Sequence, residues 1–201
     1  MIKALLFTSN NEHKLKEVRE ILTDRHGIVV YSLKDFKLDI DPDENGDTYL
    51  ENALIKADET FSIFGKMPIV ADDSGLEVEC LKRSPGIKSH RYQKQNGGPV
   101  NANKTLIKEI NRTDKNNRNA SFICGIVLMF PNGRYREFTG VCPGKIAEQA
   151  EEIEGFGYDP IFIPNGYEET FNELSQEIKN TISHRALALE KMVSYLKTIK
   201  E

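Results

Sequence analysis

Two adjacent carboxylates and a hydroxyl, Asp72, Asp73 and Ser74, follow a short apolar run at residues 68–71. The run is rich in branched residues, which predicts a buried strand that ends at the first carboxylate. Because ligands gather where the strands of a helix-covered sheet end, we expect these side chains to face a ligand. Successive strand side chains point to opposite faces, so one aspartate is expected to act on the ligand. A turn that merely ends the strand is the alternative.

A polar turn at residues 9–11 joins the first predicted strand to an amphipathic helix. The backbone N–H groups at the start of such a helix can hold a phosphate. The hydroxyl of Ser9, the amide of Asn11 and the ammonium of Lys14 would assist them. Two readings weaken this prediction: the serine or asparagine can serve only as a helix cap, and Glu12 would repel a phosphate unless it points away.

A second helix is predicted over residues 49–64 by the capping box that begins with Thr48. Asn52 and Lys56 lie one turn apart on one face of this helix, so both can point toward a ligand. A solvent-exposed lysine is the alternative. The acidic loop at residues 39–47 precedes the helix, and one of its carboxylates can bind a hard cation.

The later strands include a predicted hairpin. Asn-Gly lies between two apolar runs, residues 120–130 and 135–141, and this pattern is a strong hairpin signal. Residues 76–81 are predicted to form a separate strand, and the polar residues 89–99 are predicted to form a mobile loop. The fold therefore mixes crossover connections with antiparallel strands, and we predict one domain.

Two later stretches have features that suit a nucleoside. The loop at residues 155–159 has two glycines, and Phe156 or Tyr158 can stack on a planar base, although a turn with core aromatics is equally consistent. His184 and Arg185 begin the last amphipathic helix, where the helix dipole disfavours positive charge. A nearby anion or electron-rich ligand would explain their position.

Composition excludes several classes of protein. The 201 residues are 39% hydrophobic and 29% charged, which is ordinary for a globular protein. No apolar run reaches the roughly 18 residues of a membrane span, and no signal peptide is predicted, so we expect a cytoplasmic protein. Three widely spaced cysteines indicate neither a disulfide framework nor a zinc site. A net charge of -4 gives no electrostatic reason to bind nucleic acid.

Taken together, these motifs resemble the Ham1/ITPase family, which comprises purine nucleoside triphosphate pyrophosphatases that act on ITP, dITP and XTP. The resemblance runs in unbroken order from the first strand to the last helix. It rests on five motifs: Thr8-Ser-Asn-Asn-Glu-His-Lys14; Glu44-x-Gly46-x-Thr48-x-x-Glu51-Asn-Ala-x-x-Lys56-Ala; Ala71-Asp-Asp-Ser-Gly-Leu76; Gly155-Phe-Gly-Tyr-Asp-Pro160; and Lys179 with Ile182-Ser-His-Arg185.

The resemblance implies hydrolysis of ITP, dITP and XTP to the monophosphate and pyrophosphate, with Mg²⁺ as cofactor. It implies an α/β fold with an elongated mixed β-sheet flanked by helices, two lobes and a central active-site cleft. One such domain would span residues 1–201, and the protein would be a homodimer. Nucleic acid and membranes are not expected partners.

The resemblance also implies roles for individual residues. Asp73 would be the general base and a metal ligand, Glu44 the second metal ligand, and Ser74 a substrate contact. The family usually has threonine where this chain has Ser9, so a hydroxyl is retained there. The expected triphosphate contacts are Ser9, Asn10, Asn11, Glu12, His13, Lys14 and Lys56. The expected nucleoside contacts are Phe156, Gly157, Tyr158, Asp159, Lys179, His184 and Arg185.

Base selection can be argued from hydrogen-bond donors. Hypoxanthine and xanthine present an oxygen at C6, whereas adenine presents an amino group, so a donor in the site favours the first two. We expect Arg185 or a loop N–H near Phe156 to supply that donor. Two other functions remain open: a pyrophosphatase for pyrimidine or modified nucleotides, and a nucleotide-binding module without catalysis.

Overall fold

The computed structural model describes residues 2–149 and 155–199, which include every residue predicted above to belong to the site. Contacts between Cα atoms divide the chain into two compact units. The first unit comprises residues 2–73, Cys124–Gly140 and residues 184–199. The second comprises Ser74–Ile123, residues 141–149 and residues 155–183. That the whole chain is a single domain stays a prediction.

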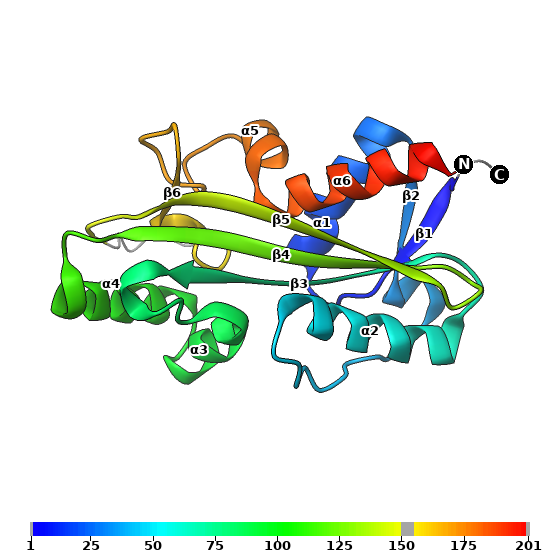
Figure 1. Cartoon of the computed structure of the whole chain (residues 1–201), viewed down its shortest axis with the longest axis horizontal. Helices are drawn as coiled ribbons and strands as arrows, with labels where there is room; N and C mark the ends of the chain where they lie inside the picture. Colours follow the sequence, from blue (N-terminus) through cyan, green and yellow to red (C-terminus); the bar gives the residue numbers. More distant parts are fainter. Residues whose placement is uncertain (1, 150–154, 200–201) are drawn as a thin grey trace. The chain divides into compact units, whose positions relative to one another are not determined.

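Six strands form one sheet in the order β2-β1-β3-β4-β5-β6. β1 pairs in parallel with both β2 and β3, whereas β5 and β6 are antiparallel, so the predicted mixed sheet with flanking helices is confirmed (Figure 1). The strands are β1 Ala4–Phe7, β2 Val29–Ser32, β3 Ile69–Val78, β4 Asn119–Met129, β5 Tyr135–Ile146 and β6 Phe162–Pro164. The α-helices are α1 Glu12–Arg19, α2 Tyr49–Phe64, α3 Ser89–Gln95, α4 Pro99–Asp114, α5 Gln176–Ile182 and α6 His184–Thr198.

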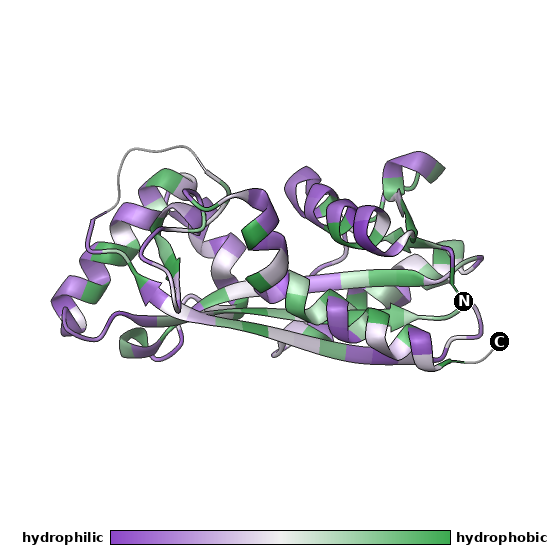
Figure 2. Cartoon of the chain, turned by 90° about the horizontal axis from the view of Figure 1, so that it is seen from above, coloured by the Kyte–Doolittle hydropathy of each residue, from purple (hydrophilic) through white to green (hydrophobic). Residues whose placement is uncertain are grey.

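The local signals for the helices are confirmed at α2. Thr48 accepts a hydrogen bond from the backbone N–H of Glu51, the Glu51 carboxylate accepts one from the Thr48 N–H, and the helix ends at Gly65. α1 continues into a π-helical turn, Glu20–Asp24, before the chain turns at Gly27 with φ 67°. The helices carry alternating hydrophilic and hydrophobic bands, as amphipathic helices do (Figure 2).

Alternation along the strands gives the first unit two hydrophobic clusters. Leu5 and Phe7 of β1 pack in a cluster with apolar residues of α1 and α6. Leu6, between them, belongs to a second cluster with Ala53 and Ala57 of α2. Because neighbouring strand residues face opposite ways, α1 and α6 cover one face of these strands and α2 covers the other.

The prediction that the central strand ends at Asp72 is wrong. β3 runs unbroken from Ile69 to Val78, so the first half of the separate strand predicted at residues 76–81, residues 76–78, is the end of β3. Residues 79–81 form a 3₁₀ turn. Two carboxylates lie inside a strand here because cations from helices compensate their burial, and the local sequence pattern cannot show that compensation.

The second unit has its own core, which includes Leu76, Leu106, Ile110, Phe122 and Phe162. The predicted hairpin is confirmed in outline, since β4 and β5 are neighbours in the sheet and residues 130–134 connect them. The loop predicted at residues 89–99 is wrong except at residues 96–98, because residues 89–95 form α3 and Pro99 begins α4.

Contacts of Ser89 and Tyr92 stabilise α3 although most of its residues are polar. Ser89 donates its hydroxyl hydrogen to the Gly86 carbonyl at 2.7 Å and accepts from the Leu76 N–H at 2.9 Å. Tyr92 packs against the core of the second unit. Gly97 and Gly98, with φ of 76° and 105°, form the short connection to α4. Among the described residues, none of the helices combines the length and apolarity that crossing a bilayer requires.

Gly140 marks the point where β5 closely approaches α6. A Cβ added at Gly140 would lie 2.0 Å from the His184 carbonyl oxygen and 2.6 Å from the Ala188 nitrogen. We expect Gly140→Ala to lower the free energy of unfolding by about 3 kcal/mol, because these backbone atoms cannot move aside. Urea unfolding measures this loss. Glu137→Ala, at an exposed position of the same strand, is the matched control, and equal midpoints for the two variants would contradict the expectation.

Candidate active site

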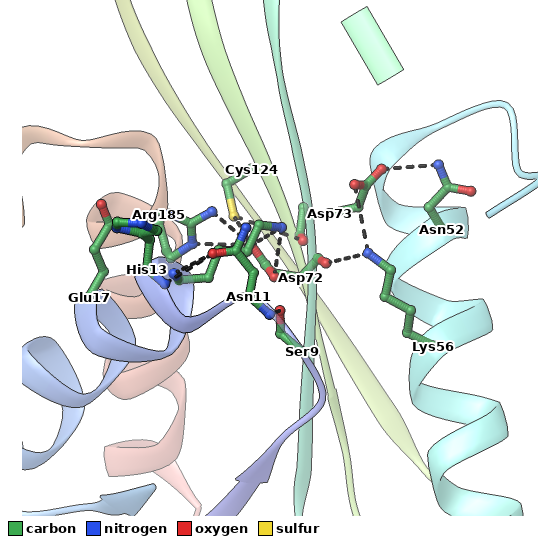
Figure 3. A network of polar contacts seen from close by, with 12 residues as sticks. Ser9, Asn11, His13, Glu17, Asn52, Lys56, Asp72, Asp73, Cys124 and Arg185 are labelled. Atoms are coloured by element: carbon green, nitrogen blue, oxygen red, sulfur yellow. Dashed lines mark hydrogen bonds and ion pairs between the residues drawn. The ribbon is translucent and has the colours of Figure 1, made fainter. Parts of the chain in front are cut away.

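Asp72 and Asp73 point to opposite faces of β3, as the alternation along a strand predicts. Figure 3 shows Asp73 directed toward Asn52 and Lys56 on α2, whereas Asp72 lies on the side of Arg185. Both carboxylates are buried, with exposed fractions of 1% for Asp72 and 5% for Asp73. Two adjacent residues of one strand therefore hold charges in two separate environments.

Asp72 is surrounded by positive charge. The ammonium of Lys14 lies 3.1 Å from both of its carboxylate oxygens. Nε and Nη2 of Arg185 both donate to Oδ2, at 3.1 and 3.0 Å. Burial would raise the pKa of Asp72, but the charges of Lys14 and Arg185 outweigh it and hold the pKa below its usual range. Asp72 is therefore a fixed anion.

Arg185 is 1% exposed and joins α6 to both β3 and α1. Besides Asp72, its guanidinium donates through Nη1 to the carboxylate of Glu17, which is also buried. Burial would lower the pKa of Arg185, but the charges of Asp72 and Glu17 raise it. The described partners of Arg185 are thus two carboxylates of the protein, whereas the predicted role of Arg185 is to donate a hydrogen bond to the base.

Sequence reasoning missed Glu17. It lies three residues after Lys14 on α1, on the stripe with Leu15 and Val18 that faces the core. A carboxylate on the apolar face of a helix is a signal in itself, because buried acids are nearly always paired. The partner could not be found from the sequence, since Arg185 is 168 residues away.

Cys124 lies beside Asp72, with Sγ 4.0 Å from Oδ2. Burial and the charge of Asp72 raise the pKa of this thiol to about 12. A thiol that stays protonated is a poor nucleophile, so Cys124 is a core residue of β4 rather than a reactive one.

On the other face of β3, Asp73 accepts a hydrogen bond from Asn52 at 3.0 Å. The ammonium of Lys56 lies 3.8 Å from Asp73 Oδ1, 2.8 Å from Glu44 Oε1 and 2.9 Å from the Asp72 carbonyl oxygen. Asn52 and Lys56 thus both point inward from α2, and the alternative of a solvent-exposed lysine is wrong. The two predicted metal ligands, Glu44 and Asp73, both contact the Lys56 ammonium.

The proton affinities on this face are raised. Burial raises the pKa of Asp73 and the charge of Glu44 adds to it, while Lys56 opposes both without cancelling them. Burial would lower the pKa of Lys56, but the charges of Asp73, Asp72 and Glu44 outweigh it and raise the pKa. Asp73 is therefore the carboxylate of the pair that accepts a proton more readily, whereas Asp72 stays ionised.

The turn before α1 is organised by its own side chains. Asn11 caps the helix, since its Oδ1 accepts from the backbone N–H groups of His13 and Lys14 at 3.0 and 3.2 Å. Ser9 Oγ accepts from the Asn11 N–H at 3.2 Å, and Asn10 donates to the Ile40 carbonyl at 3.1 Å. The capping alternative is therefore realised, and the side chains at residues 10–13 are exposed.

Two further contacts bear on the phosphate prediction. Thr8 is buried and accepts from the Thr60 hydroxyl at 3.0 Å, so Ser9 supplies the hydroxyl of the turn, in agreement with its place in the motif. Glu12 pairs with Lys34, and the hydrogen bond and charge of Lys34 lower the pKa of Glu12. Pairing with Lys34 offsets the repulsion that Glu12 would exert on a phosphate.

The predicted nucleoside residues at 156–159 and Lys179 come together in the second unit. The ammonium of Lys179 lies 2.5 Å from Asp159 Oδ2 and 5.7 Å from the centroid of the Phe156 ring. Tyr158 is buried, and its hydroxyl donates to the Ser89 carbonyl at 2.9 Å. Gly157 has φ 60°, a conformation that favours glycine.

The remaining two predicted residues lie in different units. Ser74 follows Asp73 on β3 and is half-buried in the second unit. His184 is the first residue of α6 and is buried in the first unit. The structure therefore groups Asp73, Glu44 and Lys56 in one cluster and the residues around Lys179 in another.

Fold and site together define an α/β protein in which carboxylates and lysines flank a strand, an arrangement suited to a phosphorylated ligand. The chain belongs to the Ham1 family, whose model matches residues 5–195. It is 40% identical over 203 residues to a dITP/XTP pyrophosphatase of Clostridium perfringens (strain 13 / Type A), with 98% of this chain and 99% of that protein covered.

Two further comparisons agree. A dITP/XTP pyrophosphatase of Leptospira interrogans serogroup Icterohaemorrhagiae serovar copenhageni (strain Fiocruz L1-130) is 39% identical, with 98% of this chain and 99% of that protein covered. The solved structure of a HAM1 protein from Coxiella burnetii has a TM-score of 0.85 and 36% identity, and the match covers 99% of this chain and 100% of that one. The predicted resemblance to the family is thus confirmed.

Proposed function

We propose that this protein is a nucleoside-triphosphate pyrophosphatase that hydrolyses dITP, XTP and ITP to the monophosphate and pyrophosphate, and so removes these nucleotides from the pool. The relatives named above are dITP/XTP pyrophosphatases. The observation that carries the proposal is the convergence of Glu44 and Asp73 on the ammonium of Lys56. Asp73, which can accept a proton, therefore lies beside the Lys56 ammonium, whose charge can neutralise a triphosphate.

Asp73 is the general base of the proposed reaction. Its pKa is raised, so it binds the proton of an attacking water more readily than Asp72, which Lys14 and Arg185 keep ionised. Asn52 donates to Asp73 Oδ2 and fixes the orientation of the carboxylate. The water oxygen attacks phosphorus, its proton passes to Asp73, and the bond to the pyrophosphate leaving group breaks.

Glu44 and Asp73 would hold the magnesium ion. Both approach the Lys56 ammonium, and this shared contact with a positive charge supports the proposal of a cation site. Mg²⁺ needs only one or two protein carboxylates because it keeps waters and binds substrate phosphates. The described residues hold no cluster of three or more His, Cys, Asp or Glu side chains able to bind a metal. A bound Mg²⁺ supplies charge neutralisation on the phosphates.

Residues of the α1 turn and α2 would bind the triphosphate. Lys14 and Lys56 contribute positive charge, and Ser9 contributes a hydroxyl. Asn11 Oδ1 occupies the N–H groups of His13 and Lys14, so a phosphate at this turn would bind the side chains or displace the cap. Asn10, Glu12 and His13 are the other residues that we assign to this turn of the site.

Residues of the second unit would bind the nucleoside. Phe156 offers a ring for stacking, and Lys179 and Asp159 offer a donor and an acceptor for hydrogen bonds. Ser74, Gly157 and Tyr158 complete the set from the second unit, and His184 of the first unit is also assigned to the nucleoside. The base-reading role of Arg185 stays a prediction, because its described contacts with Asp72 and Glu17 support a role in fixing Asp72. A backbone N–H near Phe156 is the alternative donor.

We extend the proposal to location and partners. The protein acts on free nucleotides in the cytoplasm as a homodimer, and it uses neither nucleic acid nor membranes as partners. The net charge of -4 supports a small-molecule substrate over a nucleic acid. Sedimentation equilibrium measures the oligomeric state, and a monomer at micromolar concentration would contradict that part.

A substrate panel tests the function. The protein is incubated with Mg²⁺ and separately with ITP, XTP, dITP, GTP and ATP, and the products are resolved by anion exchange. We expect the monophosphate and pyrophosphate from the first three and little product from the last two. A nucleoside diphosphate with phosphate would contradict the assigned bond, and the absence of turnover would favour the binding module. In the same assay with CTP and UTP, efficient turnover would favour the pyrophosphatase for pyrimidine or modified nucleotides.

A further inference from the structure

Asn103 is a polar residue on the buried face of α4. It is 4% exposed, and it lies on the stripe formed by Ala102, Leu106, Ile107 and Ile110. A carboxamide in an apolar environment is costly unless its polar atoms are hydrogen-bonded. The partner of Asn103 is therefore informative.

The amide of Asn103 binds the glycine turn of the loop at residues 155–159. Its Nδ2 donates to the Gly157 carbonyl oxygen at 3.1 Å. Because a carbonyl only accepts, this contact also fixes which atom of the carboxamide is nitrogen. The residue that Asn103 holds has φ 60°, so the contact stabilises a backbone conformation that few residues adopt.

The same loop is held at a second point by the hydroxyl of Tyr158, which donates to the Ser89 carbonyl. Within the loop, the Asp159 N–H donates to the Phe156 carbonyl at 3.0 Å. The peptide of Gly157 lies between Phe156 and Asp159, so its orientation decides where the ring and the carboxylate point. Asn103 sets that orientation from outside the loop.

Two other polar atoms near this turn have no hydrogen-bond partner in the described structure. Asn103 Oδ1 and Gln93 Nε2 are buried without a hydrogen-bond partner. Gln93 Nε2 also lies 3.7 Å from where a Cβ on Gly157 would stand. Asn103 therefore keeps its place despite one unsatisfied oxygen, which costs about 1–3 kcal/mol.

We propose that Asn103 is a positioning residue that sets base selectivity by fixing the Gly157 peptide. This inference rests on the proposed function, which assigns Phe156 and Asp159 to the nucleoside. Asn103 acts through the loop and is not assigned a contact with the substrate.

The test compares Asn103→Leu with Asn101→Leu, an exposed position on the same helix. The ratio of kcat/KM for dITP to that for dATP is expected to fall about tenfold in the first variant, the equivalent of one hydrogen bond. The fall should come from the KM for dITP, with kcat little changed. An unchanged ratio in a folded Asn103→Leu protein would overturn the inference.

Asn103→Asp supplies a second readout in case the leucine variant does not fold. A protonated carboxyl donates to the Gly157 carbonyl, whereas an ionised one cannot. The dITP to dATP ratio of this variant should therefore fall as the pH is raised through the pKa of the new carboxyl, relative to the unmodified protein. A ratio that follows the unmodified protein at every pH would overturn the inference.

Hydrogen exchange separates this inference from the proposed function. In the nucleotide-free protein, the Asp159 amide is expected to exchange about tenfold faster in Asn103→Leu than in Asn101→Leu, because the loop loses its anchor. Unchanged exchange overturns the positioning role even if the protein is an active pyrophosphatase. Faster exchange supports that role even if the substrate panel shows no turnover.

Discussion

Asp73→Asn is expected to lower kcat for dITP by about 10³-fold, because the variant loses the base that accepts the water proton and one of the two carboxylates assigned to the metal. The amide keeps the shape of the carboxyl group, so packing on this face of β3 is preserved. Steady-state kinetics with saturating Mg²⁺ measures the loss. A variant that keeps more than about a tenth of the activity would contradict the assignment of Asp73 as the general base.

Stability is the control for this experiment. The raised pKa of Asp73 means that the folded protein binds this proton more tightly than the unfolded chain does. Ionised Asp73 therefore costs stability as the pH rises above about 4, the unfolded value. Asp73→Asn removes that cost, so at neutral pH without metal the variant should be at least as stable as the unmodified protein. A large loss of stability would indicate that the activity fell because the fold did.

Asp72→Asn is expected to lower stability, whereas Asp73→Asn is expected to lower activity and keep stability. The change at Asp72 should lower the free energy of unfolding by about 3–5 kcal/mol, because removing one partner of a buried ion pair leaves the other charge uncompensated. Arg185 would then be buried with Glu17 as its remaining acidic partner in the described contacts, and Lys14 would lose its carboxylate. Urea unfolding at neutral pH measures this loss. A change below about 1 kcal/mol would contradict the view that Asp72 anchors α1 and α6.

The pH dependence of this loss follows from the pKa of Asp72, which is lowered in the folded protein. Its ionised carboxylate stabilises the fold fully above about pH 4, the unfolded value, and the contribution is lost as the pH falls toward the folded value. The difference in stability between the unmodified protein and Asp72→Asn should therefore shrink below about pH 4. If this difference in stability stayed constant below about pH 4, the contribution of Asp72 to stability would not be ionic.

The two variants form a matched pair, since the same substitution is made at adjacent positions of one strand. Asp72→Asn removes a carboxylate that contacts both Lys14 and Arg185. Asp73→Asn removes a carboxylate whose pKa is raised. Loss of activity without loss of stability at Asp73, together with loss of stability at Asp72, would assign chemistry to one face of β3 and structure to the other.

The sequence by itself determined much of the local structure, and it supplied the site residues as a prediction. The capping box at Thr48, the apolar stripes of the helices and the Asn-Gly hairpin depend on residues close in the chain, and these predictions are confirmed. The opposite directions of Asp72 and Asp73 also followed from the sequence, because strand alternation needs no tertiary information. The motifs were enough to indicate the family.

Only the tertiary structure decided which charges are paired. The strand does not end at Asp72, because cations from α1, α2 and α6 make its buried carboxylates tolerable. Arg185 meets Asp72 across 113 residues and Glu17 across 168, and Asn103 meets Gly157 across 54. Such contacts depend on how the chain returns to itself, and the energy of a buried charge depends on all of its neighbours at once. No local pattern encodes that sum, so only the fold decides which charged residues become partners.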